Sequence, residues 1–353
     1  AGSGYYDSAF IFVDPTDANP EAVPVQVTVK EAPRKKLVFG VGFTTDGGPH
    51  VSAEYTDQRV PGIGWRAVTK MQLETKAPFI QSAWTDIPDE NGWSSGVLAR
   101  YDRLDDGELV TTAQKLRIGK TKNTDQYDRS FYVQYDRASV RGSGTNTVSE
   151  ADVGDGSALS ANYVWTGRYF DSLPYPTTGY GLGAEIGGGY TLSAPRKPFL
   201  RAVGRWLGIL PITERQGRIQ FRAEGGAVEA STEARIPSTQ QFRTGGDTTV
   251  RGYAFRDIGI DRANGVVGPG RYVAIGSVEW QRPYYSDGLP TAIENTFFVD
   301  FGDVANKPIN LRPQYGVGTG VRVRTPIGPL TAAVAYGLDS RKFRLHLTVG
   351  FTF

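Results

Sequence analysis

Apolar and polar side chains alternate along the C-terminal segment of the chain. From Lys342 to the end, every second position is apolar: Phe343, Leu345, Leu347, Val349, Phe351 and Phe353. The positions between them are polar or glycine: Lys342, Arg344, His346, Thr348, Gly350 and Thr352. A period of two residues predicts a β-strand with one apolar face and one wet face.

The same alternation recurs about sixteen times between roughly Lys36 and Phe353, in segments that reach the ~9–11 residues of a tilted strand across a bilayer. Gly328–Leu338, Tyr315–Arg324 and Asn295–Asp303 are clear examples. Helical patterning is nearly absent, which argues against a parallel α/β sheet. The chain also lacks the fixed period of a propeller. The pattern therefore favours strands with one face to water and one to lipid, and a soluble β protein is the alternative.

The connections between these segments differ in length in a regular way. Counted from Lys36, those after even strands are short and turn-like, as at Arg59–Gly64. Those after odd strands include the two longest, Arg137–Gly156 and Ala234–Gly270. Outer-membrane barrels have short periplasmic turns and long extracellular loops, and in lipid every strand edge must be paired. We therefore predict an all-β fold, a transmembrane antiparallel β-barrel of about 16 strands.

Composition excludes several other classes of protein. The 39 basic and 37 acidic residues leave a net charge of +2, which argues against a nucleic-acid surface. The chain has no cysteine and two histidines, so it offers neither thiolates nor a histidine cluster for a metal. Apolar stretches such as Leu330–Tyr336 are far shorter than a membrane helix. We find no catalytic constellation and expect no enzyme activity and no cofactor.

Residues 1–33 have a different pattern. Ala9–Val13 and the alternating valines Val23, Val25, Val27 and Val29 flank a turn region rich in proline, aspartate and asparagine. This pattern predicts a hairpin, which is too small to fold alone. We interpret it as the end of a soluble periplasmic module whose remainder precedes Ala1.

One motif resembles a known family. Phe242–Tyr253 lies in the longest connection, and its Val250-Arg251-Gly252-Tyr253 resembles the signature of the sixth extracellular loop of the BamA/TamA superfamily of outer-membrane assembly factors. Phe298-Val299-Asp300-Phe301-Gly302 resembles the carboxylate motif that follows it in that family. The resemblance covers the whole chain. Residues 1–33 look like the C-terminal part of a POTRA domain, and residues 34–353 like a barrel with residues 234–270 folded into its lumen. TamA-type subunits are the most similar, partly because Gly42–Pro49 resembles their first hairpin.

The resemblance implies roles for the motif residues. In the family the arginine of this loop meets carboxylates of the inner wall, and the matching acids here are Glu279 and Asp300. Alternation places both inward, and a guanidinium can hold two carboxylates at once. Gly252 is expected to allow close approach or a positive φ, and Tyr253 to pack against the wall. Without the two acids, Arg251 would be read as a solvated loop residue.

A second candidate site is the seam where the first and last strands meet. The first strand, Lys36–Thr45, contains Gly40 and Gly42, and the last, Arg341–Phe353, contains Gly350 near its end. Glycine weakens a strand, so we hypothesise a seam that is short of hydrogen bonds; glycines elsewhere in the chain leave the alternative that these three are ordinary. Phe353 resembles a C-terminal assembly signal, or it anchors the membrane girdle.

The resemblance also implies a function. A TamA-like factor in the outer membrane of a Gram-negative bacterium inserts or secretes outer-membrane proteins and autotransporters by pairing a client strand with the seam. Its partners would be unfolded outer-membrane proteins, the lipid bilayer and a TamB-like periplasmic protein anchored in the inner membrane, with no nucleic acid. Two alternatives stay open: an exporter or pore of the two-partner-secretion type, and the barrel of a patatin-type autotransporter.

Overall fold

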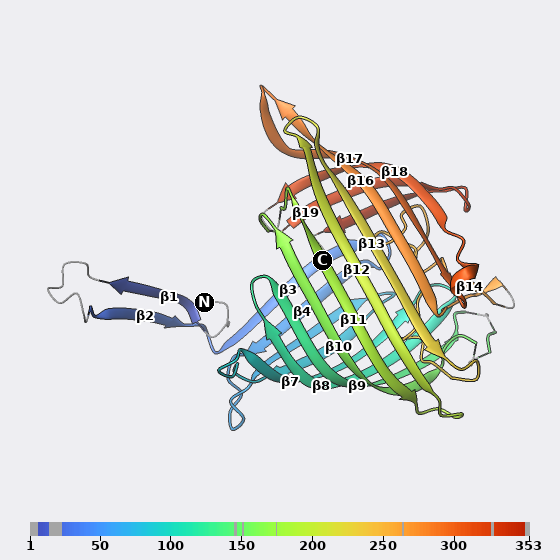
Figure 1. Cartoon of the computed structure of the whole chain (residues 1–353), viewed down its shortest axis with the longest axis horizontal. Helices are drawn as coiled ribbons and strands as arrows, with labels where there is room; N and C mark the ends of the chain where they lie inside the picture. The colour runs from blue at the N-terminus through green and yellow to red at the C-terminus, as the bar shows by residue number, and fades with distance from the viewer. Residues whose placement is uncertain are drawn as a thin grey trace.

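The computed structural model describes residues 6–13, 23–144, 147–149, 152–173, 175–262, 265–325 and 328–349. Near the N-terminus, β1 (Tyr6–Val13) and β2 (Val25–Glu31) pair antiparallel as a separate two-stranded sheet. This hairpin stands outside the main body of the molecule (Figure 1). The predicted hairpin is therefore present, and its assignment to a POTRA domain stays a prediction.

Sixteen strands form a single antiparallel sheet that curls into a barrel (Figure 1). Strands that are consecutive in the sheet are joined by the chain in sequence order. The strands are β3 (Lys35–Thr44), β4 (Gly48–Asp57), β5 (Arg66–Glu74), β6 (Phe79–Thr85), β7 (Trp93–Asp105), β8 (Leu109–Asn123), β9 (Tyr127–Gly142), β10 (Gly156–Phe170), β11 (Gly179–Thr191), β12 (Pro198–Thr213), β13 (Gly217–Ala230), β16 (Tyr272–Ser286), β17 (Leu289–Ala305), β18 (Gln314–Thr325), β19 (Gly328–Gly337) and β20 (Lys342–Val349). The predicted fold class is confirmed. The two longest connections, β9 to β10 and β13 to β16, follow odd strands as predicted, but the regular alternation of lengths is not found: residues 58–65 after β4 form a longer connection than residues 45–47 after β3.

The alternation read from the sequence separates the two faces of the barrel wall. Large apolar side chains are exposed on the outer face, as Val41 of β3 and Phe343 of β20 show with 86% and 75% exposure. The side chains at the alternate, inward positions of the strands are polar. Several of them are buried, among them Glu294 and Asp300 of β17. Such a surface is stable only where lipid meets the apolar face. Within the described ranges, no helix is long and apolar enough to cross a membrane.

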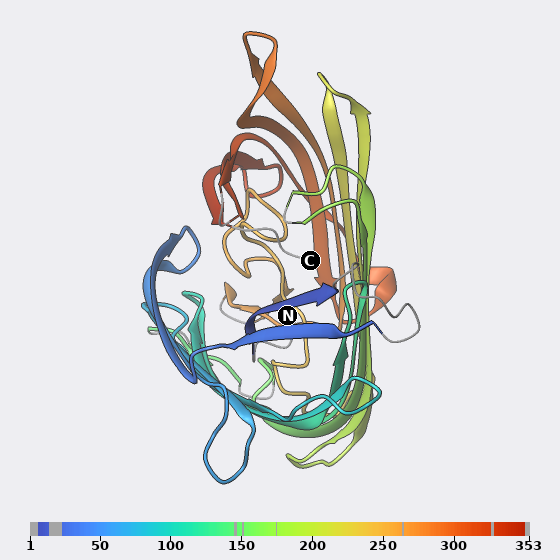
Figure 2. The same ribbon diagram turned by 90° about the vertical axis from the view of Figure 1, so that its left-hand side faces the viewer.

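The sheet begins at β3 and ends at β20, and these two strands face each other across the seam (Figure 2). Among the described residues, no backbone ladder joins them. One weak contact crosses the seam, from the backbone N–H of Leu347 to Oγ1 of Thr45 at 3.4 Å. Gly350, predicted to weaken the seam, and Phe353, predicted as a C-terminal signal, both lie outside the described residues.

Gly40 and Gly42 have a local packing role in the first hairpin. A Cβ added to Gly40 would lie 2.7 Å from Oγ of Ser52, and one added to Gly42 would lie 2.4 Å from Nε2 of His50. Both neighbours come from the adjacent strand β4. The two glycines therefore make room for inward side chains of β4, and their effect on the seam stays a hypothesis.

Candidate functional site

The connection between β13 and β16, residues 231–271, turns back into the barrel. In Figure 2 it lies in the space enclosed by the strands of the wall. We call it the lumen loop; it begins and ends within a few residues of the predicted range 234–270. It has its own pairing, in β14 (Ile260–Asp261) with β15 (Val267–Gly268) and in a bridge between Thr244 and Ile258. The loop is therefore an ordered element.

An apolar core fixes the lumen loop against the inner wall. Val250, Tyr253 and Ile258 of the loop are at most 2% exposed. They belong to one buried cluster with apolar side chains of the wall: Phe199, Val203, Val228, Val273, Ile275 and Val304. Burial of apolar side chains supplies stabilisation of ~1.5–3 kcal/mol for each large residue. This part of the lumen is dry, which strengthens the polar contacts beside it.

Arg251 extends from the lumen loop to two acids of the wall. Its Nε and Nη2 donate to the two oxygens of Asp300 at 2.7 and 2.9 Å, and its Nη1 donates to Glu279 at 2.6 Å. The guanidinium also lies 3.3 Å from the ring centroid of Phe298. Burial alone would lower the pKa of Arg251, but its hydrogen bonds to Asp300 and the charges of Asp300 and Glu279 raise it. The arginine therefore stays charged and holds strands β16 and β17 together with the loop.

Asp300 is the acceptor at the centre of this cluster. Besides the guanidinium, it accepts the backbone N–H of Arg251 at 3.0 Å and the hydroxyl of Ser277 at 2.6 Å. Glu279 has fewer partners, namely Arg251 and the amide of Gln281 at 2.8 Å. Asp300 therefore positions both the backbone and the side chain of Arg251, whereas Glu279 contacts the side chain alone.

Gly252 allows the lumen loop to touch the wall through its backbone. Its φ is +98°, which favours glycine, and an added Cβ would lie 2.7 Å from the backbone nitrogen of Gly337. Its N–H donates to Nε2 of His346 at 3.0 Å. Opposite the loop, a Cβ on Gly316 would lie 1.8 Å from the carbonyl oxygen of Arg251. The backbone of the loop packs directly against the backbone of the wall, which explains why both Gly252 of the loop and Gly316 of the wall are glycines.

Tyr253 fastens the lumen loop to the end of the barrel near the β19–β20 turn. Its hydroxyl lies 2.9 Å from the carboxylate of Asp339 and 3.1 Å from the carbonyl oxygen of Tyr315. Burial, together with the Asp339 carboxylate, raises the pKa of Tyr253 to about 12. The phenol therefore keeps its proton and remains a donor.

Two residues that hold the lumen loop were not singled out from the sequence. His346 was expected to be a solvated residue of the lumen wall, but it is 3% exposed and accepts the Gly252 N–H. Arg222 of β13 donates to the carbonyl oxygens of Thr248 and Thr249. Alternation placed His346 on the polar face of its strand, but the path of the loop that makes His346 and Arg222 its partners has no local signal.

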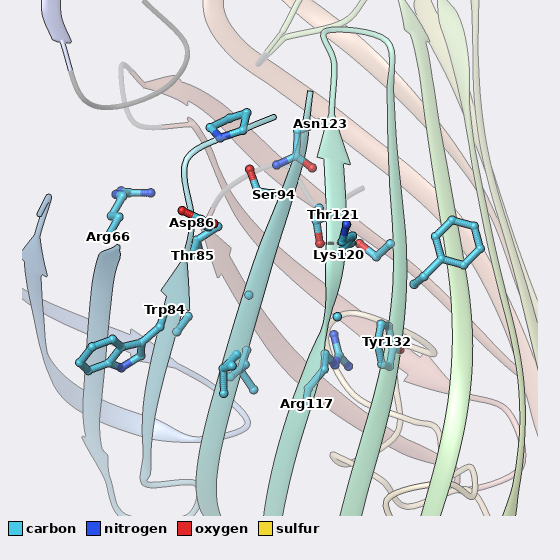
Figure 3. A pocket seen from close by; sticks show the side chains of 18 of the residues that line it. Arg66, Trp84, Thr85, Asp86, Ser94, Arg117, Lys120, Thr121, Asn123 and Tyr132 are labelled. Carbon is cyan, nitrogen blue, oxygen red and sulfur yellow. Dashed lines mark hydrogen bonds between the residues drawn. The ribbon is translucent and has the colours of Figure 1, made fainter. Parts of the chain in front are cut away.

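The other side of the lumen is less filled. A cavity of about 540 Å³ lies along β5 to β9. Figure 3 shows Arg66, Arg117 and Tyr132 among the side chains around it. Arg117 stacks 3.7 Å from the ring centroid of Tyr132 and donates to Gln134 at 2.7 Å. In the part of the chain that is described, no three histidine or acidic side chains are grouped to hold a metal ion.

The whole barrel matches a known family. The model of the Omp85 superfamily domain matches residues 39–353. The chain belongs to the Omp85 superfamily. The superfamily includes outer-membrane β-barrels of the kind found in Gram-negative bacteria, and this Omp85 barrel is such an outer-membrane protein.

Individual relatives agree with this placement. The outer envelope protein 80 of Arabidopsis thaliana chloroplasts is 31% identical over 144 residues, a match that covers 38% of this chain and 17% of that protein. The chain thus spans a small part of that relative's length. BamA from Haemophilus ducreyi, solved without POTRA domains 1–3, superposes with a TM-score of 0.75 at 19% identity over 100% of this chain and 76% of that one. CdiB from Acinetobacter baumannii superposes with a TM-score of 0.59 at 14% identity, and the match covers 99% of this chain and 66% of CdiB.

Proposed function

We propose that this Omp85 barrel inserts or secretes outer-membrane proteins by pairing a client strand with an exposed strand edge at the β3–β20 seam. The observation that carries the proposal is the seam itself: among the described residues, β3 and β20 end the sheet without a ladder between them. Unpaired backbone groups of an edge strand are a template for another strand. No nucleotide or cofactor is required for such pairing.

The wall is also short on the β3 side of the seam. β3 and β4 have 10 residues each, whereas β16 and β17 have 15 and 17. Short strands span less hydrocarbon and have fewer ladder hydrogen bonds to break, each worth ~0.5–1.5 kcal/mol net in water. Together with the missing ladder between β3 and β20, the short strands β3 and β4 make the seam easier to open in this proposal.

The finer assignment within this proposal is a TamA-like role. It rests on the motif of residues 250–253, on the resemblance of Gly42–Pro49 to the first hairpin of TamA-type subunits and on the hairpin β1–β2, which we assign to the end of a POTRA domain. A TamB-like periplasmic partner and unfolded outer-membrane proteins would then be its partners. Phe353, in this proposal, is the signal for the insertion of the barrel itself.

An exporter of the two-partner-secretion type is the second candidate, supported by the structural likeness to CdiB. An exporter conducts its client through the lumen, whereas a templating factor keeps the lumen loop docked. A patatin-type autotransporter barrel is the third, and a lipase-like domain upstream of Ala1 would favour it.

The test is client insertion by the purified barrel in lipid vesicles. An outer-membrane protein unfolded in urea is added, and its folding is followed by protease resistance and by heat-modifiable migration on gels. We expect client folding well above that in empty vesicles, with small single-channel conductance. A large, steady conductance without client folding would favour the exporter.

A further inference from the structure

We propose that Asp46 and Asp247 form a proton-dependent joint between the lumen loop and the first strand hairpin, and that through this joint the loop straps the two sides of the seam together. Both acids are positioning residues, since they act through the loop and not on a client. The inference rests on the proposed function, because it concerns how that seam is held closed.

The lumen loop has a fastening on each side of the seam. On the β20 side, the N–H of Gly252 donates to His346 at 3.0 Å. On the β3 side, the N–H of Asp247 donates to Oδ2 of Asp46, in the turn between β3 and β4, at 3.1 Å. These two contacts are only five residues apart in the loop, so one short segment joins strands that the sheet itself leaves unpaired.

The β3 fastening brings two acids together. The backbone N–H of Asp247 donates to the carboxylate of Asp46, and burial together with that carboxylate raises the pKa of Asp247. A Cβ added to Gly246 would lie 2.6 Å from Oδ2 of Asp46, so the loop is packed closely on this carboxyl. Two carboxyl groups in this arrangement hold together when they share one proton and repel each other when both are ionised.

Cations lie near the pair without forming a salt bridge to it among the described residues. A cavity of about 300 Å³ lies between the turn, the loop and β20; its charged and titratable lining comprises Asp46 itself, Lys76, Asp106, Tyr253, Arg344 and His346. Asp106 is already bound to Arg243 at 2.6 Å. Among the described residues, no salt bridge involves Asp46 or Asp247. Burial, followed by the hydrogen bond and charge of Asp46, raises the pKa of Asp247 to about 7.

The direction of the pH effect follows from this shift. In the docked loop Asp247 takes up its proton near pH 7, whereas an undocked Asp247 titrates at the ordinary value of ~3.9. Docking is therefore strongest where both states are protonated, weakens as the pH rises from about 4 to about 7, and stays weak above that. The Asp46–Asp247 contact is therefore strong in acid and weak at neutral pH, whereas the Gly252–His346 contact requires an unprotonated Nε2.

The test measures the width of the seam with spin labels. The chain has no cysteine, so Val41→Cys on β3 and Leu345→Cys on β20 give one labelled pair at outward, exposed positions. Pulsed EPR distances in nanodiscs are compared at pH 4.5 and pH 8. We expect a shift to longer and broader distances at pH 8 in the labelled parent.

Two matched variants of the labelled pair isolate the joint. In Asp247→Asn and in Asp46→Asn, the amide group of asparagine donates the hydrogen bond that a protonated carboxyl would donate. The amide does not titrate, so both variants should keep the short spin-label distance at pH 4.5 and at pH 8. Identical distributions at both pH values in the labelled parent overturn the proposal. A shift that persists in both variants also overturns it and assigns the effect to His346 or another group.

The same samples separate this proposal from the proposed function. If the barrel folds clients in vesicles but shows no pH-dependent change in the spin-label distance, the proposed function is supported and the proposed Asp46–Asp247 joint is contradicted. If the distance changes with pH, Asp247→Asn abolishes that change and the barrel folds no client, the joint is supported and the proposed function is contradicted.

Discussion

Arg251 brings a nearly buried charge into the wall of the barrel. The cost of removing a guanidinium from water is several kcal/mol, and it is offset only when the charge is paired and its donors are used. Here two acids and the ring of Phe298 surround it. The cluster favours this position of the lumen loop, because moving the loop would leave buried donors of Arg251 and two buried acids without partners.

Arg251→Ala should therefore destabilise the docked loop strongly. Removing one partner of a buried pair costs about 3–5 kcal/mol, because Asp300 and Glu279 remain as unpaired buried charges. We expect a lower temperature for loss of heat-modifiable migration and protease cleavage within residues 231–271. Arg215→Ala, at an exposed turn between β12 and β13, is the control and should change neither. An unchanged melting temperature in Arg251→Ala would contradict a structural role for the cluster.

The two acids should differ in their effect. Asp300 accepts four hydrogen bonds, three from Arg251 and one from Ser277, whereas Glu279 accepts one from Arg251 and one from Gln281. Asp300→Asn should then lower the melting temperature of the barrel more than Glu279→Gln. Equal losses in both variants would show that the number of hydrogen bonds does not set the contribution.

Residue contacts could be predicted from sequence only in part. Alternation set the inward direction of Glu279 and Asp300, and the motif gave Arg251 as their partner, so the expected neighbours do come together. His346, Arg222 and Asp46 were missed. Each meets the lumen loop only because of the path that the loop takes, and no periodic pattern encodes that path.

At the scale of elements, the lumen loop is held by its core, by Arg251 and by close backbone contact. The bounds of this loop were predicted within a few residues, since the strands on either side alternate clearly. Its small pair β14–β15 was not predicted, because two-residue strands leave no periodic signal. The role of the seam glycines stays a hypothesis: Gly40 and Gly42 make room for Ser52 and His50 of β4, and Gly350 lies outside the described residues.

Gly252→Ala tests the close backbone contact of the loop. Alanine must adopt φ +98° and place its Cβ 2.7 Å from the backbone of Gly337. The strain of such a conformation alone is about 1–3 kcal/mol. Gly265→Ala in the same loop is the matched control, because its φ is +73° and nothing lies within 4 Å of its Cβ. We expect a clearly lower melting temperature for Gly252→Ala than for Gly265→Ala. Equal melting temperatures would show that the positive φ alone causes the loss and that the close contact with Gly337 contributes nothing.

At the scale of the whole molecule, the fold was predictable because each strand must have a lipid face and a water face. This requirement gives every strand the same two-residue period, and sixteen such strands appear in the sheet. The state of the seam was not predictable in the same way. Strand closure depends on whether backbone groups of β3 and β20 meet, and the side-chain pattern of each strand is the same whether they do or not.

The most direct test of the proposed function is to lock the seam. Thr45 and Leu347 lie across it, with Oγ1 of Thr45 3.4 Å from the backbone nitrogen of Leu347, and the natural chain contains no cysteine that could interfere. Thr45→Cys combined with Leu347→Cys should form a disulfide that is visible as altered gel migration. Each single cysteine variant is a control. We predict that the oxidised double variant stops folding client barrels in vesicles and that reduction restores this activity; full client folding by the oxidised, locked barrel would contradict templating at the seam.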